Sequence, residues 1–278
     1  MKRPILIFAI LFAFACGSEA QEKSKTDSLI FTELNSKVLN EKRRIVVHLP
    51  LNYTKQSSKK YPVMYVLDAG SMDFNIADRL FTLASARIAP ECITVGILNA
   101  RNTRERDQTP TFMQTNVDDP ASPFGKSDQF LEYIQSELIP LIDSSYRTTG
   151  YQTISGHSRA GLFVLYTLLL KPELFNARFC YSTPAWRFDN ILIKKLEEAL
   201  RKKPLNKDSY LFFTVGENEN PNIKASFNIL IEMLKSTKPK RLKWGSYLTP
   251  LADHQTNPVF SAAKALAEWA KVLKVTSE

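Results

Sequence analysis

The chain has 278 residues, of which 44% are hydrophobic and 23% are charged, a composition that is typical of a folded domain and excludes disordered and collagen-like chains. The formal net charge is +9. The basic residues are scattered and no nucleic-acid-binding motif accompanies them, so we predict no nucleic-acid partner and interpret the charge as a solvated surface that also favours anionic ligands.

The first 20 residues have the pattern of an export signal. Lys2 and Arg3 are followed by an apolar run, Pro4–Ala15, that is too short to span a bilayer comfortably. Small residues up to Ala20 then predict cleavage after that position. We therefore expect residues 1–20 to be a signal peptide and the protein to be exported, with a periplasmic location as the first interpretation.

A second interpretation of the same segment makes Cys16 the lipid-carrying cysteine of a membrane-anchored lipoprotein, which is the only membrane attachment that we predict. Residues 21–40 are polar and are expected to form a loose lead-in to one domain at 41–275. Cys92 and Cys180 lie on separate predicted strands, so we expect two buried thiols and no disulfide framework. No Cys/His cluster has metal-ligand spacing, and we predict no metal site.

Strand-like and helix-like runs alternate along the domain. We predict strands at Ile45–Leu49, Val63–Leu67, Ile93–Leu98, Tyr151–Ser155, Ala177–Tyr181, Tyr210–Val215 and Lys243–Leu248, and helices at Ile76–Ile88, Phe130–Leu138, Ile191–Leu200, Ile223–Leu234 and Val259–Val272. This alternation predicts an α/β fold with a mostly parallel sheet and helices on both of its faces. Catalytic residues are then expected at the carboxyl ends of the strands.

The segment around Ser158 has the context of a nucleophile elbow. A β-prone run precedes it, an apolar helical run at Leu162–Leu170 follows it, and Gly156 and Ala160 lie two residues to either side. A serine in so tight a strand-to-helix turn needs small neighbours, because the strand and the helix approach closely there. The alternative is a Gly-Ser turn that merely caps a buried helix.

The general base can be sought among three histidines. His157 is inside the elbow with its side chain directed away from the serine, and His48 lies in an early strand, which favours a structural role. His254 is in a polar loop before the last helix, where the order serine, acid, histidine places the base. Histidine has the pKa needed to accept the serine proton near neutrality. The alternative for His254 is a solvated loop residue.

The acid is expected between the serine and the histidine, just after a strand. Leu211–Gly216 is apolar and β-prone, and Glu217 and Glu219 follow it. Either glutamate could orient the imidazole, and we favour Glu219. Asp253 is adjacent to the base on the same loop, so we interpret it as a loop-shaping residue.

Together these features resemble the Putative esterase family of α/β-hydrolases, and within it the siderophore esterases of the enterobactin and salmochelin type. The likeness is carried by Tyr61–Asp68, Arg104–Pro110, Glu137–Pro140, the elbow, the Val215–Glu217 turn and the Asp253–His254 loop. The resemblance implies an acid three residues after Gly216, which is Glu219. The chain departs from the family where Arg159-Ala160 stands in place of Met-Gly or Phe-Gly, and where Asp68-Ala69-Gly70 stands in place of Asp-Gly.

The resemblance also places the polar segment 100–127 beside the active site. Arg101 and Arg104 either bind anionic or catecholate groups of the substrate or hold the shape of the loop, whereas Arg106 and Asp107 favour an internal ion-pair network. Trp186 either lines the acyl or aryl pocket or covers the helix that follows it.

These expectations combine into an exported serine esterase that needs no cofactor. Ser158, His254 and Glu219 are the predicted triad, and the backbone N–H groups of Gly70 and Arg159 are the predicted oxyanion donors. The expected partner is a small-molecule or glycan ester: a siderophore or other catechol-type ester, a short acyl ester or an esterified polysaccharide. The rivals are an acyltransferase on the same fold and a non-catalytic protein that binds glycans or siderophores.

Overall fold

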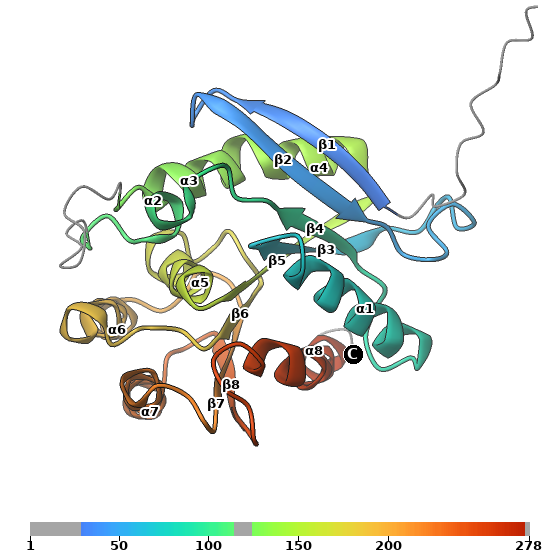
Figure 1. The fold of residues 1–278 in the computed structure, drawn as a ribbon. Coiled ribbons are helices and arrows are strands. Elements are labelled where there is room, and N and C mark those ends of the chain that lie inside the picture. The colour runs from blue at the N-terminus through green and yellow to red at the C-terminus, as the bar shows by residue number, and fades with distance from the viewer. Residues whose placement is uncertain (1–28, 114–123, 276–278) are drawn as a thin grey trace, which may run out of the picture.

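The computed structural model describes residues 29–113 and 124–275 (Figure 1). The predicted signal peptide, Cys16 and residues 21–28 lie outside this range. Eight strands form one sheet in the order β1-β2-β4-β3-β5-β6-β7-β8. Their bounds are β1 Leu29–Ser36, β2 Glu41–His48, β3 Tyr61–Leu67, β4 Ile93–Ile97, β5 Thr148–His157, β6 Ala177–Tyr181, β7 Ser209–Gly216 and β8 Leu242–Thr249. Strands β3 to β8 are parallel, and β1 and β2 join one edge antiparallel.

Strand β1 corrects one expectation. Residues 29–40, predicted to belong to a loose lead-in, instead form β1 and the turn into β2, with Leu29 opposite His48 and Ser36 opposite Glu41. The side chains of β1 alternate mainly between half-buried and exposed. An edge strand with one face in water can contain many polar residues, so polar composition alone does not distinguish this strand from a loop.

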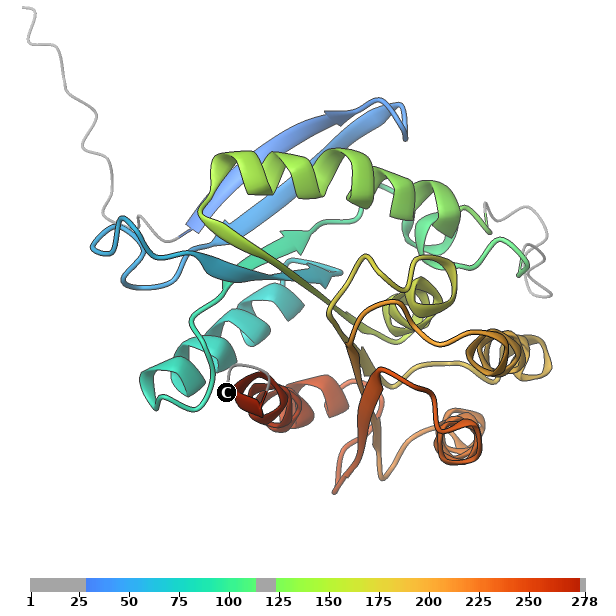
Figure 2. The same cartoon turned by 180° about the vertical axis from the view of Figure 1, so that it is seen from behind.

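Helices cover both faces of the sheet, as the alternating sequence pattern predicts (Figures 1 and 2). The helical segments are α1 Met72–Ser85, α2 Arg104–Gln108, α3 Ser127–Tyr133, the π-helical turn η1 Ile134–Leu138, α4 Ile139–Ser145, α5 Arg159–Leu170, α6 Arg187–Lys202, α7 Pro221–Thr237 and α8 Asn257–Val275. Helices α1 and α8 pack on one face around the fully buried Trp269, and α3 to α7 pack on the other face around residues such as Phe163 and Leu192.

The helix that begins at Ser127 is longer than predicted, because it continues through Pro140 to Ser145. Proline has no N–H to donate and disturbs an α-helical turn. Here the chain widens locally, and the Ile139 N–H donates to the carbonyl oxygen of Ile134, five residues earlier. This turn lets the helix pass the proline without a break.

The two cysteines of the described domain agree with the prediction. Cys92 and Cys180 are both buried and unbridged, and burial raises the pKa of each thiol well above its usual value. Within residues 29–113 and 124–275, no helix is long and apolar enough to cross a membrane. Over the same residues, no group of three or more histidine, cysteine, aspartate or glutamate side chains is placed to hold a metal ion.

Candidate active site

Ser158 occupies a strained turn between β5 and α5. Its φ of +58° and ψ of −121° are unusual for a residue with a side chain, and such strain is concentrated at functional sites. A Cβ added to Gly156 would lie 2.5 Å from the backbone carbonyl carbon of Ala160, and one added to Gly161 would lie 2.5 Å from Thr183 Oγ1. The predicted strand, turn and helix are therefore present, and only small residues fit around the serine.

Three predicted side chains meet at this turn although they are far apart in the sequence. His254 Nε2 lies 3.0 Å from Ser158 Oγ, and His254 Nδ1 lies 2.7 Å from Glu219 Oε1. A carboxylate only accepts hydrogen bonds, so the imidazole proton is on Nδ1 and is donated to Glu219. In the neutral ring Nε2 is then the acceptor, and it faces the serine hydroxyl.

Burial separates the two candidate acids. Glu219 is only 6% exposed, whereas Glu217 is exposed and accepts a hydrogen bond from the Leu251 N–H at 2.8 Å. Burial alone would raise the pKa of Glu219, but hydrogen bonding with His254 and the nearby Ser182 hydroxyl outweighs it, and the pKa lies below its usual value. Glu219 thus remains ionised beside the imidazole.

Hydrogen bonds between residues of the His254 loop itself fix the conformation of that loop. Asp253 Oδ1 accepts hydrogen bonds from the backbone N–H groups of Gln255, at 3.1 Å, and Thr256, at 2.9 Å. This is the loop-shaping role that was expected of Asp253. The buried Asn257 then begins α8 and donates to the hydroxyl groups of Thr214 in β7 and of Ser182, just after β6.

His157 takes a part in the site that the sequence did not reveal. Its Nε2 lies 2.7 Å from the backbone carbonyl oxygen of His254, and because a carbonyl only accepts, Nε2 carries the proton. Burial, followed by the proximity of His254, lowers the pKa of His157 to about 4. A neutral His157 therefore holds the backbone of His254 while the imidazole of His254 faces the serine.

The two predicted oxyanion donors differ in the structure. Arg159 is the first residue of α5, and the first N–H groups of a helix have no acceptor within it. The Gly70 N–H instead donates to Asp73 Oδ1 at 2.7 Å, and the Ala69 N–H donates to the Ile97 carbonyl at 3.1 Å. The expectation of a free donor at Gly70 is not met here, because the first turn of α1 supplies a carboxylate that accepts it.

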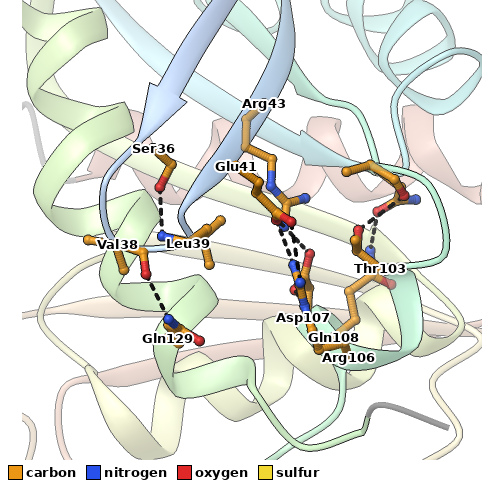
Figure 3. Close-up of polar contacts among 12 residues, drawn as sticks. Ser36, Val38, Leu39, Glu41, Arg43, Thr103, Arg106, Asp107, Gln108 and Gln129 are labelled. Carbon is orange, nitrogen blue, oxygen red and sulfur yellow. Dashed lines mark hydrogen bonds and ion pairs between the residues drawn. The ribbon is translucent and has the colours of Figure 1, made fainter.

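The arginine-rich loop divides into two groups. Arg106 Nε donates to Asp107 Oδ1 at 2.7 Å and its Nη2 donates to Glu41 at 2.6 Å, while the buried Arg43 pairs with the other Asp107 oxygen (Figure 3). This network ties α2 to β2, as was expected for Arg106 and Asp107. Arg104 belongs to a different group: its Nε and Nη2 reach both oxygens of Asp68 at 2.7–3.0 Å.

A cavity of about 530 Å³ opens beside the serine. Its lining includes Arg104, Ser158, Arg159, Trp186, Arg187 and His254. Trp186 thus lies at the cavity wall, one of the two roles expected for it. Arg101 is exposed and does not line the cavity, so the structure does not bring it to the site. Arg159 and Arg187 also line it, and the sequence predicted no binding role for their side chains.

Known proteins resemble this chain in sequence and in fold. The profile of the family described as Putative esterase matches residues 36–271. The chain is 29% identical to the ferri-bacillibactin esterase BesA of Bacillus subtilis (strain 168) over 199 residues, which cover 65% of this chain and 68% of that protein.

Solved structures of other proteins have the same fold as this chain. An IroE-like serine hydrolase from Shewanella oneidensis superposes with a TM-score of 0.81 at 28% identity, covering 87% of this chain and 80% of that chain. The enterobactin hydrolase IroE in complex with DFP superposes with a TM-score of 0.65 at 19% identity, covering 87% and 94%, and at that identity supports the fold alone. The chain therefore belongs to the Putative esterase family, with the α/β-hydrolase fold and an ester-hydrolysing activity.

Proposed function

We propose that this protein is an exported serine esterase in which Ser158, His254 and Glu219 act as the catalytic triad on a carboxylic ester. The observation that carries the proposal is the unbroken hydrogen-bond chain from Ser158 Oγ through the imidazole to the buried Glu219. A binding protein needs no such chain, whereas a serine nucleophile needs a base to take its proton.

In the first half-reaction, Ser158 Oγ attacks the ester carbonyl carbon and His254 Nε2 takes the hydroxyl proton. The imidazole becomes positively charged, and the ionised Glu219 stabilises that charge through the bond to Nδ1. When the tetrahedral intermediate collapses, Nε2 gives its proton to the leaving alcohol and an acyl-Ser158 ester remains.

In the second half-reaction, water takes the place of the alcohol. His254 accepts a proton from the water as its oxygen attacks the acyl carbon, then returns a proton to Ser158 as the acid product leaves. The Arg159 N–H at the start of α5 is the proposed oxyanion donor in both steps, where it meets charge that develops only in the transition state.

The substrate class that we propose is a siderophore or other catechol-type ester. Its support is the activity of a relative, a ferri-bacillibactin esterase, together with a cavity whose wall combines Trp186 with several arginines. An aromatic wall stacks on a flat aryl group and guanidinium groups bind its negatively charged oxygens.

Kinetics on three esters test the proposal. The purified protein should hydrolyse a ferric catecholate ester with a higher kcat/KM than a short-chain aryl ester or an acetylated polysaccharide, and Ser158→Ala should abolish all three activities. A preference for the acetylated polysaccharide would contradict the catechol-type substrate and indicate a glycan ester. If added glycerol receives the acyl group and less free acid forms, the protein acts as an acyltransferase and not as a hydrolase.

The proposed location rests on the sequence alone, because residues 1–28 lie outside the described part of the chain. Fractionation of cells that produce the full chain should recover the protein outside the cytoplasm. Cys16→Ala separates the two forms of export: release from the membrane fraction indicates a lipid on Cys16, and an unchanged soluble distribution indicates cleavage after Ala20.

A further inference from the structure

The described residues that line the cavity beside Ser158 include three arginines and two carboxylates. Arg104, Arg159 and Arg187 all line it. Arg104 is compensated by the two-oxygen contact with Asp68, whose carboxylate lies 2.7 Å from Arg104 Nη2. Among residues 29–113 and 124–275, neither Arg159 nor Arg187 makes a two-oxygen contact of this kind, so their surroundings decide what this part of the cavity can bind.

Arg159 is mostly buried, with a side chain only 15% exposed. Its Nη1 donates to Thr109 Oγ1 at 2.9 Å, and its guanidinium lies over the Phe124 ring at 5.0 Å. The carboxylate of Glu105 forms an ion pair with Arg159 at 3.8 Å from Nε, longer than a hydrogen bond. Burial and the like charge of Arg187 lower the pKa of Arg159 to about 10, so the group is still charged at neutral pH.

The positive charge of Arg187 acts on Arg159, although Arg187 belongs to a different element, the start of α6. Its Nε is buried and has no hydrogen-bond partner among the described residues. The guanidinium carbon is 5.3 Å from the centroid of the Trp186 ring, which it partly covers. A buried donor without an acceptor costs free energy, and an acceptor brought by a ligand removes that cost.

The acidic residues of the cavity are already engaged. Glu219 accepts from His254 and Asp253 accepts from Thr256. A fully partnered arginine looks different: the buried Arg178 donates to the carbonyl oxygens of Phe175, Lys171 and Pro172, at 2.9–3.1 Å. In that setting no ligand is needed, whereas within the described residues Arg159 has one hydrogen bond and a longer ion pair with Glu105, and Arg187 Nε has no partner.

We infer that Arg159 and Arg187 form a subsite that holds a negatively charged oxygen substituent of the ester substrate, a carboxylate or a metal-bound catecholate. The inference rests on the proposed function, because it places this group on the molecule that Ser158 attacks. Guanidinium groups bind such oxygens through short charge-assisted hydrogen bonds, and Trp186 supplies a face for the aryl ring that carries them.

The side chain of Arg159 is separable from the oxyanion donor at the same position. The resembled family often has Met or Phe after the serine, so the backbone N–H does not depend on the guanidinium. The subsite is therefore a feature of this chain added to the esterase machinery, and it can be removed while the backbone donor stays.

Matched esters test the subsite. Two of the esters have the same acyl group and the same size, but one carries a free carboxylate where the other carries the corresponding carboxamide. A third ester carries a ferric catecholate. The ratio of kcat/KM for anionic over neutral ester should fall about tenfold in Arg187→Gln and in Arg159→Met, the loss expected for one charge-assisted hydrogen bond. Which anionic ester shows the fall identifies the source of the negative oxygen.

Arg101→Gln is the matched control, since it removes an exposed arginine charge from the neighbouring loop. Its ratio should stay within about twofold of the unmodified protein, because exposed charges are screened by salt. An equal fall in Arg101→Gln, or equal losses on anionic and neutral esters in Arg187→Gln at an unchanged melting temperature, would overturn the inference.

A binding measurement separates this inference from the proposed function. Calorimetry should show benzoate binding to Ser158→Ala more tightly than benzamide, and Arg187→Gln introduced into that variant should remove the difference. If the unmodified protein hydrolyses no ester but benzoate still binds through Arg187, the triad assignment fails and the subsite stands. If esters are hydrolysed but benzoate and benzamide bind alike, the subsite fails and the triad stands.

Discussion

Two histidine–carboxylate pairs lie within residues 29–113 and 124–275, and in that part of the chain only one of them reaches a hydroxyl. His254 uses Nδ1 for Glu219, at 2.7 Å, which turns Nε2 toward Ser158. His48 uses Nε2 for Asp73, also at 2.7 Å, and the second Asp73 oxygen is taken by the Gly70 N–H. Both carboxylates are buried, so the pairing itself does not distinguish a base from a structural histidine.

The difference lies in what surrounds each imidazole. His48 is on the antiparallel strand β2 with its ring edge against Phe74. It lines a larger cavity, about 1010 Å³, that contains none of the predicted site residues. His254 follows a parallel strand at the carboxyl edge of the sheet, where the elbow presents Ser158. Cavity size is therefore a poorer guide to the active site than the position of the nucleophile.

Removing either Ser158 or His254 should have the largest effect. We expect Ser158→Ala and His254→Ala each to lower kcat/KM by roughly 10³-fold or more, because the hydroxyl and its base act in one step. The double variant should be little worse than either single variant. A multiplicative loss in steady-state kinetics would contradict a shared step, and His48→Ala, measured beside them, should keep most of the activity.

Exchanging each carboxylate for its amide compares the two pairs directly. Glu219→Gln should lower kcat by at least about a hundredfold, because the imidazolium loses its negative partner and the ring its preferred tautomer. Asp73→Asn should cost less than about tenfold, since its histidine takes no proton from the nucleophile. Glu217→Gln is the matched control on the exposed neighbour, and a larger loss there than in Glu219→Gln would transfer the role of the acid.

His157, which holds the backbone of His254, should make the folding stability depend on pH. His157 has a pKa of about 4 in the folded protein and about 6.5 when unfolded. The unfolded state thus binds more protons between these values, and folding stability should fall by up to about 3 kcal/mol as the pH drops from 6.5 to 4.

His157→Gln keeps a donor for the His254 carbonyl but cannot titrate. Urea unfolding measured across this pH range should give a flatter profile for the variant than for the unmodified protein. Two parallel profiles would show that His157 is not held neutral by the fold.

The carboxylate of the second pair should give the smallest effect. Burial would raise the pKa of Asp73, but hydrogen bonds from His48 and the Gly70 N–H lower it below its usual value. Its stabilising contribution is present above the unfolded pKa of about 3.9 and is lost as the pH falls further. Asp73→Asn should therefore be less stable at pH 7, by urea unfolding, and the gap to the unmodified protein should narrow at acid pH. A gap that does not change with pH would remove Asp73 from this account.

The sequence predicted best those features that depend on neighbouring residues. Gly156 and Ala160 define the elbow locally, and the parallel strands follow from continuous apolar runs such as that of β7. The sequence did not predict features that depend on tertiary contacts. The polar β1 is a strand because β2 pairs with it, and the Gly70 N–H is occupied because the chain folds Asp73 back onto it. Arg159 and Arg187 line one cavity because the start of α6 lies near the start of α5.

The most direct test of the central claim is peptide mass spectrometry after treatment with a fluorophosphonate probe, which reacts with serines made nucleophilic by a base. The account predicts one adduct per chain, on the peptide that contains Ser158, and its loss in His254→Ala. No adduct on the folded protein, or an adduct on another serine, would contradict the assignment of Ser158, His254 and Glu219 as the catalytic triad.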